Sequence, residues 1–361
     1  MHRHRLNLKR QLPVRRLDRM KKIFLSIMVL LVGTLVLLTG ALLYYQNKMN
    51  TFGSYPDTME EYDHHYLFVA SDRSEMMQDI FEAACLAAKE GGGYLEWCGS
   101  GTPDSYTEAE YIDISIAMDA DGIIVCPDGS DGIEEAVGRA HDAGIPAVTI
   151  LRDLPDSKRI SYAGVSGYQT GEIYGGRLIS LLHDGWNDVC LLEDSEAGKD
   201  EAQILYSQIV QAVKNGAPSG KTLHLRTEEV DSNTDFDTEE VVRNLLLGTH
   251  IPDILICESP VQTECAIQTL IDYNLVGHLQ VIGYYATDTI LRALEQELIP
   301  VTMIVDTVQL GKDCTEALDE YRELGRTSSY YNVALDSITP KTAADYIAGH
   351  SAGEKQGEDL S

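Results

Sequence analysis

The sequence predicts an α/β protein with parallel sheets, preceded by one N-terminal transmembrane helix. Short apolar runs alternate with segments of helical periodicity from Tyr66 onward, which is the order that parallel sheets require. Before them, Ile23 to Leu43 forms a run of 21 residues without a charge. As a helix this run spans about 32 Å, enough to cross a bilayer. At 361 residues, the chain can hold one two-lobed domain or two domains of ordinary size.

The N-terminal region indicates which side of the membrane the body occupies. Residues 1–22 carry nine Lys or Arg and one Asp, so we expect a basic cytoplasmic tail. Residues 23–45 are predicted to be an uncleaved signal anchor, which puts the body outside the cell membrane. A cleaved signal peptide is the alternative. Residues 46–65 are polar and predict a tether.

Charge and cysteine content limit the partners. The whole chain has a net charge of −29, and the part after the basic tail carries about −37. Such an acidic body repels phosphate backbones, so we expect no nucleic-acid partner. The seven cysteines form no CxxC pair, and we expect buried free thiols rather than a metal or redox site.

The stretch from Asp121 to Ser157 shows the alternation most clearly. Ile123 to Cys126 predicts a buried strand, a helix follows from a capping box at Asp131, and Ile145 to Ile150 predicts the next strand. This second strand ends at Arg152-Asp153. Ligands of open α/β sheets bind beyond the carboxyl ends of strands, so a charged pair there is a candidate site.

The same alternation of helices and strands extends along the chain. Ser74 is a plausible N-cap, and Ser259-Pro260 with Gln262 marks another helix start. Helices are expected at about 75–90, 108–118, 171–182, 203–213, 238–247, 290–294 and 310–324. Strands are expected at 66–70, 94–98, 160–164, 189–192, 222–226, 254–257, 281–283, 301–306 and 333–335.

Three phrases, Asp121-Gly122-Ile123-Ile124, Ala143 to Ile150 and Arg152-Asp153, resemble the type I periplasmic binding proteins. Within these proteins, the ribose/galactose-binding branch, which shares its fold with the LacI effector domain, is the most similar. The resemblance covers roughly Tyr66 to Tyr346. It implies two Rossmann-like lobes with parallel sheets, joined by three hinge strands. It divides the chain into an N-terminal lobe (66–162 plus 306–327), a C-terminal lobe (163–305 plus 328–348) and a disordered tail (349–361).

The resemblance also implies ligand-binding positions. Arg152 stands where the family hydrogen-bonds sugar hydroxyls, although Leu151 replaces the usual preceding Asp. Its alternative role is pairing with Asp153 at the rim. Met76 and Met77 stand where two Phe usually sandwich the sugar, and their alternative role is helix core. The remaining candidates are Ser74, Gln203, Ser259, Tyr285 and Asp306.

These positions imply an extracytoplasmic solute-binding protein that closes on a small, sugar-like ligand for uptake by an ABC permease. The alternative is a membrane-tethered co-receptor of a sensor histidine kinase. We expect no enzymatic activity, cofactor or metal. The phosphate-loop-like segment Gly216 to Thr222 lies after a predicted helix and before a predicted strand, the reverse of the required order. The EF-hand-like run starting at Asp231 lacks its glycine and its bidentate Glu, and His64-His65 lacks partner ligands.

Overall fold

The computed structural model describes residue 28 and residues 62–98, 106–194, 199–230 and 235–348. The chain divides into two units, Met1–Glu61 and Tyr62–Ser361. Apart from the helical Met28, the predicted tail, anchor and most of the tether lie outside the described residues, as does the predicted C-terminal tail. Among the residues that are described, no helix is both long and apolar enough to span a membrane.

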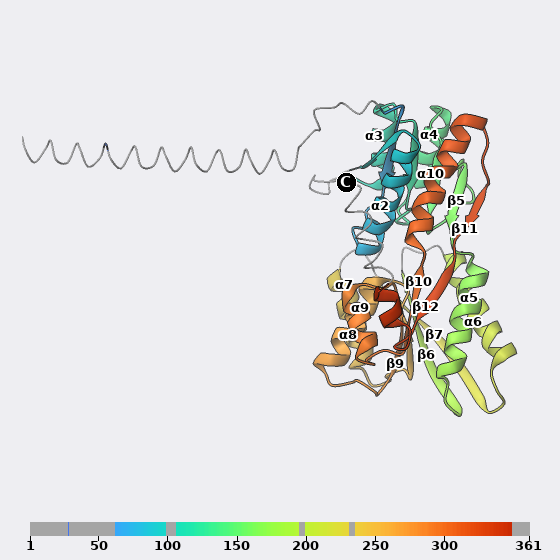
Figure 1. The fold of residues 1–361 in the computed structure, drawn as a ribbon. Coiled ribbons are helices and arrows are strands. Elements are labelled where there is room, and N and C mark those ends of the chain that lie inside the picture. The colour runs from blue at the N-terminus through green and yellow to red at the C-terminus, as the bar shows by residue number, and fades with distance from the viewer. Residues whose placement is uncertain (1–27, 29–61, 99–105, 195–198, 231–234, 349–361) are drawn as a thin grey trace, which may run out of the picture. The chain divides into compact units, whose positions relative to one another are not determined.

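The second unit contains two six-stranded sheets (Figure 1). The first sheet has the order β11-β5-β4-β3-β1-β2, and every neighbouring pair is parallel. Its strands are β1 (His64–Val69), β2 (Gly93–Trp97), β3 (Gly122–Val125), β4 (Ala147–Ile150), β5 (Ser161–Gly164) and β11 (Tyr330–Asn332).

Helices cover both faces of the first sheet. Side chains alternate between faces along each strand. Phe68, Ile124 and Ile150 therefore pack with α2 (Glu75–Glu90) and α10 (Thr307–Leu324). Ile123 and Val125 pack with α3 (Glu108–Ala117) and α4 (Ile133–Asp142) on the other side. This two-sided burial explains why the strands are continuous apolar runs in the sequence.

The second sheet repeats this arrangement. Its order is β12-β10-β9-β8-β6-β7, parallel except for the antiparallel pair of β10 and β12. The strands are β6 (Gly185–Asp194), β7 (Lys221–Val230), β8 (Ile254–Ile256), β9 (Gln280–Tyr284), β10 (Val301–Val305) and β12 (Leu335–Ile338). Helices α5 (Gly167–Leu181) and α6 (Lys199–Gly216) cover one face, and α7 (Asp235–Leu246), α8 (Pro260–Asp272) and α9 (Asp288–Glu295) cover the other.

Three segments connect the lobes, as predicted. The chain passes from β5 to α5, from β10 to α10, and from β11 to β12. These crossings are hydrogen-bonded to one another, because the backbone N–H of Val333 donates to Gly164 O (3.0 Å) and that of Asp306 to Ala334 O (3.3 Å). The fold class, an α/β protein of two lobes with three crossings, is therefore confirmed for the body.

Some boundaries differ from the sequence expectations. Strand β11 lies in the range expected for the C-terminal lobe, but it pairs with β5 in the first sheet. Gly132, not Asp131, caps α4, at a left-handed φ of 92° and without a side-chain cap bond. Strands β6 and β7 are ten residues each and extend beyond the expected ranges, 189–192 and 222–226. Strand β7 lies at the edge of its sheet, and its many polar residues do not form the apolar run that predicts a buried strand. His64 and His65 were expected in the tether, but both lie in β1.

Candidate functional site

Two strained residues mark the carboxyl ends of the strands. Leu151, just after β4, and Tyr285, just after β9, have φ values of 60° and 72°. Within the described residues, the other three non-glycine positions with positive φ, Asp119, Asn274 and Glu297, directly follow helix C-caps. Backbone strain of this kind costs on the order of 1–3 kcal/mol and gathers at functional sites. Both sheets thus carry an unusual residue at the edge where α/β proteins bind ligands.

Arg152 follows the first strained residue. The backbone N–H of Leu151 donates to Ala163 O (3.0 Å), and its carbonyl accepts from the Tyr162 hydroxyl (2.9 Å), so the turn is fixed from β5. The Arg152 side chain is half-buried. The carboxylate of Asp153 pairs with Arg159, including a 2.8 Å bond from Nη2 to Oδ2. Asp153 therefore already has a guanidinium partner other than Arg152.

The half-buried Cys126, just after β3, has several charged side chains around its thiol. Burial raises its pKa, with further contributions from the carboxylates of Glu108, Asp72 and Asp128, while the Arg152 guanidinium lowers it. Arg152 therefore lies with acidic residues from the ends of β1 and β3. A guanidinium among carboxylates provides both donors and acceptors, the combination that a polyol ligand requires.

Glu108 is the most deeply buried of these acids, with 2% of its surface exposed. Its Oε1 accepts from the backbone N–H of Ser71 (2.8 Å), and its Oε2 from that of Asp128 (2.9 Å). Burial and, as a smaller cause, the nearby Asp128 carboxylate raise the pKa of Glu108 to about 7, while hydrogen bonds from the backbone and side chain of Ser71 and from the backbone of Asp128 oppose the shift. This side chain joins the loop after β1 to the loop after β3.

The start of α2 holds three predicted residues. Ser74 caps the helix by accepting from the Met77 N–H (3.3 Å), and its hydroxyl donates to Asp72 (2.9 Å). Met76 and Met77 are 6% and 1% exposed and belong to the hydrophobic core. Both side chains therefore pack as core residues of the helix, which was their predicted alternative role.

Tyr285 contacts the other lobe. Its hydroxyl donates to the Asp79 carboxylate of α2, while its carbonyl accepts from the Thr302 hydroxyl (2.6 Å). Burial, followed by the Asp79 bond, raises the pKa of Tyr285. Burial also raises the pKa of Tyr346 to about 12, and the carboxylates of Asp79 and Asp306 contribute to this shift. Tyr285 and Asp306 therefore lie in one interlobe group with Asp79.

Two predicted ligands also cap helices. Ser259 Oγ accepts from the Gln262 N–H (3.2 Å), and Asp306 Oδ1 accepts from the Gln309 N–H (2.9 Å). Gln203 is exposed on α6, and no contact in the described part of the chain joins it to the other candidates. The structure thus gathers two groups: Arg152 with acids near Ser74, and Tyr285 with Asp306.

Several residues at this edge were not predicted. Asp72 and Asp128 follow β1 and β3, so the strand-end rule that identified Arg152 also applies to them. Asp79 appears in the sequence as a polar position of an amphipathic helix. Glu108 has no sequence signal, since only tertiary packing buries it.

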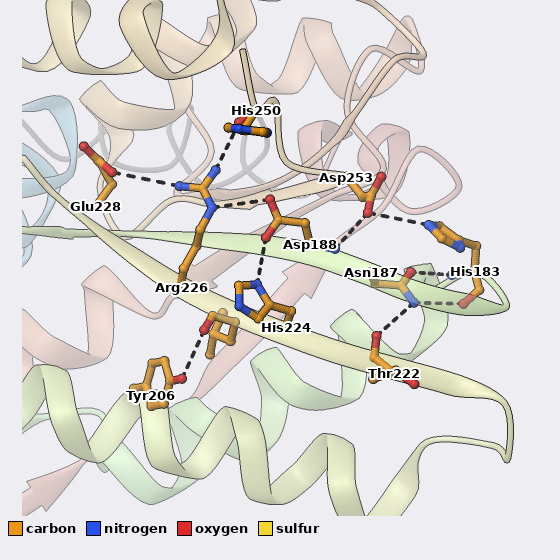
Figure 2. A network of polar contacts seen from close by, with 11 residues as sticks. His183, Asn187, Asp188, Tyr206, Thr222, His224, Arg226, Glu228, His250 and Asp253 are labelled. Carbon is orange, nitrogen blue, oxygen red and sulfur yellow. Dashed lines mark hydrogen bonds and ion pairs between the residues drawn. The ribbon is translucent and has the colours of Figure 1, made fainter. Parts of the chain in front are cut away.

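A second polar network involves β6, β7 and the loop before β8 (Figure 2). The Asp188 carboxylate contacts His224 Nδ1 (3.1 Å) and Arg226 Nε (3.3 Å), and its backbone N–H donates to Asp253 (2.8 Å). No cluster of three or more His, Cys, Asp or Glu suited to a metal occurs within the described ranges. These contacts connect β7 to β6 and to the loop before β8, so we interpret the network as structural.

Two doubly wound lobes, three crossings and polar strand ends define a bilobed ligand-binding protein. Residues 66–326 match the family model described as the periplasmic binding protein domain. The chain belongs to this family. No curated protein matches the sequence.

Solved structures share the fold at low identity. GanP, a glucose-galactose binding protein from Geobacillus stearothermophilus, is 19% identical, with a TM-score of 0.66 over 78% of this chain and 99% of its own. A solute-binding protein of an ABC transporter from Bacillus halodurans C-125, with bound myo-inositol, is 17% identical, with a TM-score of 0.67 over 81% and 99%. A chain of the XylFII-LytSN complex is 18% identical, with a TM-score of 0.64 over 78% and 99%.

Proposed function

We propose that this protein is an extracytoplasmic solute-binding protein that closes on a small, sugar-like ligand and delivers it to an ABC permease. The family and the bilobed fold support this function. The observation that carries it is Arg152, half-buried at the carboxyl end of β4 with the acids around Cys126. Proteins of similar fold include a glucose-galactose binding protein and solute-binding proteins with bound D-arabinose, D-fucose and myo-inositol.

The proposed location follows from the family and the sequence. Periplasmic binding domains act outside the cytoplasm, and they bind solutes without transforming them. The basic tail and the apolar run of residues 23–43 support a single-pass anchor with the body outside. Mass spectrometry of the mature N-terminus tests the anchor, and a terminus near Ala41 would contradict it.

A second role has its own supporting observation. One structure of similar fold is a chain of the XylFII-LytSN complex. A membrane anchor is also compatible with a co-receptor that contacts a sensor kinase in the same membrane. Co-purification of the full-length protein from its native membrane tests both roles. A permease and an ATPase would support uptake, and a histidine kinase would support sensing.

The ligand prediction is tested with full-length protein in detergent. Thermal-shift measurements with D-galactose, D-arabinose, D-ribose, D-fucose and myo-inositol should identify at least one stabilising ligand. Arg152→Ala should weaken its binding by roughly 1.5–3 kcal/mol, the range for a hydrogen bond to a charged group. Arg139→Ala, which removes an exposed pair with Asp113, is the control. If calorimetry shows that Arg152→Ala binds the ligand as tightly as the wild type, Arg152 does not contact the ligand.

A further inference from the structure

The loops after β1 and β3 share one buried anchor. The first loop contains Asp72 and leads to Ser74 and α2, and the second contains Asp128. Each loop donates one backbone N–H, from Ser71 and from Asp128, to a different oxygen of the Glu108 carboxylate. Glu108 itself belongs to neither loop, because it is the first residue of α3.

We propose that Glu108 is a positioning residue for the ligand site, holding the loops after β1 and β3 in the arrangement that ligand binding requires. This inference rests on the proposed function. The geometry supports it because a carboxylate has two acceptor oxygens and the two loops use one each. A side chain with one acceptor can hold only one loop, and the N–H of the other loop then loses its protein partner.

The charges around Glu108 predict how the anchor responds to pH. Asp72, Asp128 and Arg152 all act on the neighbouring Cys126 thiol, and Asp128 also acts on Glu108 directly. Since the pKa of Glu108 is about 7, part of the population is protonated at neutral pH. The protonated acid keeps one good acceptor, so the hold on one loop weakens as the pH falls below 7.

Glu108→Gln tests this directly, because the amide is neutral and offers one acceptor at every pH. We expect it to bind D-galactose, D-arabinose or myo-inositol roughly 10- to 150-fold more weakly than the wild type at pH 8, where Glu108 is mostly ionised, the equivalent of one hydrogen bond to a charged group. Wild-type affinity should fall toward the variant's value between pH 8 and pH 6, while the variant's affinity stays flat. Glu134→Gln, in the exposed first turn of α4, controls for loss of a helix-dipole charge.

Hydrogen exchange of the ligand-free protein separates this inference from the proposed function. The amides of Ser71 and Asp128 should exchange faster in Glu108→Gln, and faster in the wild type at pH 6 than at pH 8 once intrinsic rates are corrected. If no sugar binds, the proposed function fails while exchange still tests the anchor. A purely structural Glu108 would lower the melting temperature but leave the pH profile of affinity as in the wild type, which would overturn the inference. If Glu108→Gln does not fold, the wild type alone tests the inference. Sugar affinity and amide exchange that do not change between pH 8 and pH 6 would then overturn it.

Discussion

At the scale of single residues, helix capping explains several polar side chains that the resemblance assigned to a ligand. Ser74, Ser259 and Asp306 each accept a backbone N–H at a helix start. Because these helices begin at the carboxyl ends of strands, capping residues and ligand residues occupy the same edge of a sheet. Sequence position alone cannot separate the two roles.

Ser259 offers a way to separate them. Ser259→Ala removes the cap of α8 and should destabilise the protein by about 1 kcal/mol, measured by urea denaturation. Ser259→Asp retains an N-cap oxygen and should preserve stability. If both variants bind sugar like the wild type, Ser259 is a cap alone. If Ser259→Asp is stable but binds more weakly, the hydroxyl also contacts the ligand.

Residue by residue, the sequence was informative where a local rule applied. Arg152 follows a recognisable apolar strand, so its location at the sheet edge could be predicted. The burial of Glu108 and the contact from Tyr285 to Asp79 depend on segments 37 and 206 residues apart in sequence. No periodicity or capping pattern within one segment contains that information.

At the scale of helices and strands, prediction succeeded for elements that are buried. The strands at the centre of both sheets are apolar runs, and their locations follow from that pattern. The edge strand β7 exposes half of its residues, and only residues 222–226, in its first part, were expected to form a strand. Similarly, the first turn of α5 is rich in glycine and polar residues, which hid its start at Gly167.

Helix α5 contains two adjacent glycines with opposite surroundings. A Cβ on Gly175 would lie 2.4 Å from Ala212 Cβ of α6, whereas a Cβ on Gly176 would meet nothing within 4 Å. Gly175→Ala should therefore destabilise the protein by about 1–3 kcal/mol through overpacking. Gly176→Ala should stabilise it by up to about 1 kcal/mol, because alanine favours the helix.

Urea denaturation of this pair tests how tightly α5 and α6 pack, since each variant is the chemical control for the other. Equal effects of the two substitutions would contradict the close approach of these helices at Gly175.

At the scale of the whole molecule, two buried titratable groups, Glu108 and His64, make the free energy of unfolding depend on pH in opposite directions. Glu108 has a raised pKa, so its contribution to stability decreases as the pH rises from about 4.5 to about 7. His64 acts in the other direction. This residue is 3% exposed at the start of β1, and burial is the main cause that lowers its pKa from 6.5, with Arg322 contributing. The carboxylates of Asp319, Asp121 and Asp63 partly oppose this shift.

The sign for His64 follows from proton linkage. The unfolded chain binds the proton more tightly than the folded protein, so stability from neutral His64 is present above pH 6.5 and is lost as the pH falls below it. His64→Phe keeps a ring beside Tyr66, whose centroid is 4.7 Å away, but cannot titrate.

Urea midpoints should therefore decline less for His64→Phe than for the wild type between pH 7.5 and pH 5.5. His278→Gln, an exposed substitution, should follow the wild type. Parallel curves for His64→Phe and the wild type would mean that His64 is not held neutral in the folded protein, and that the acidic groups around it compensate for its burial.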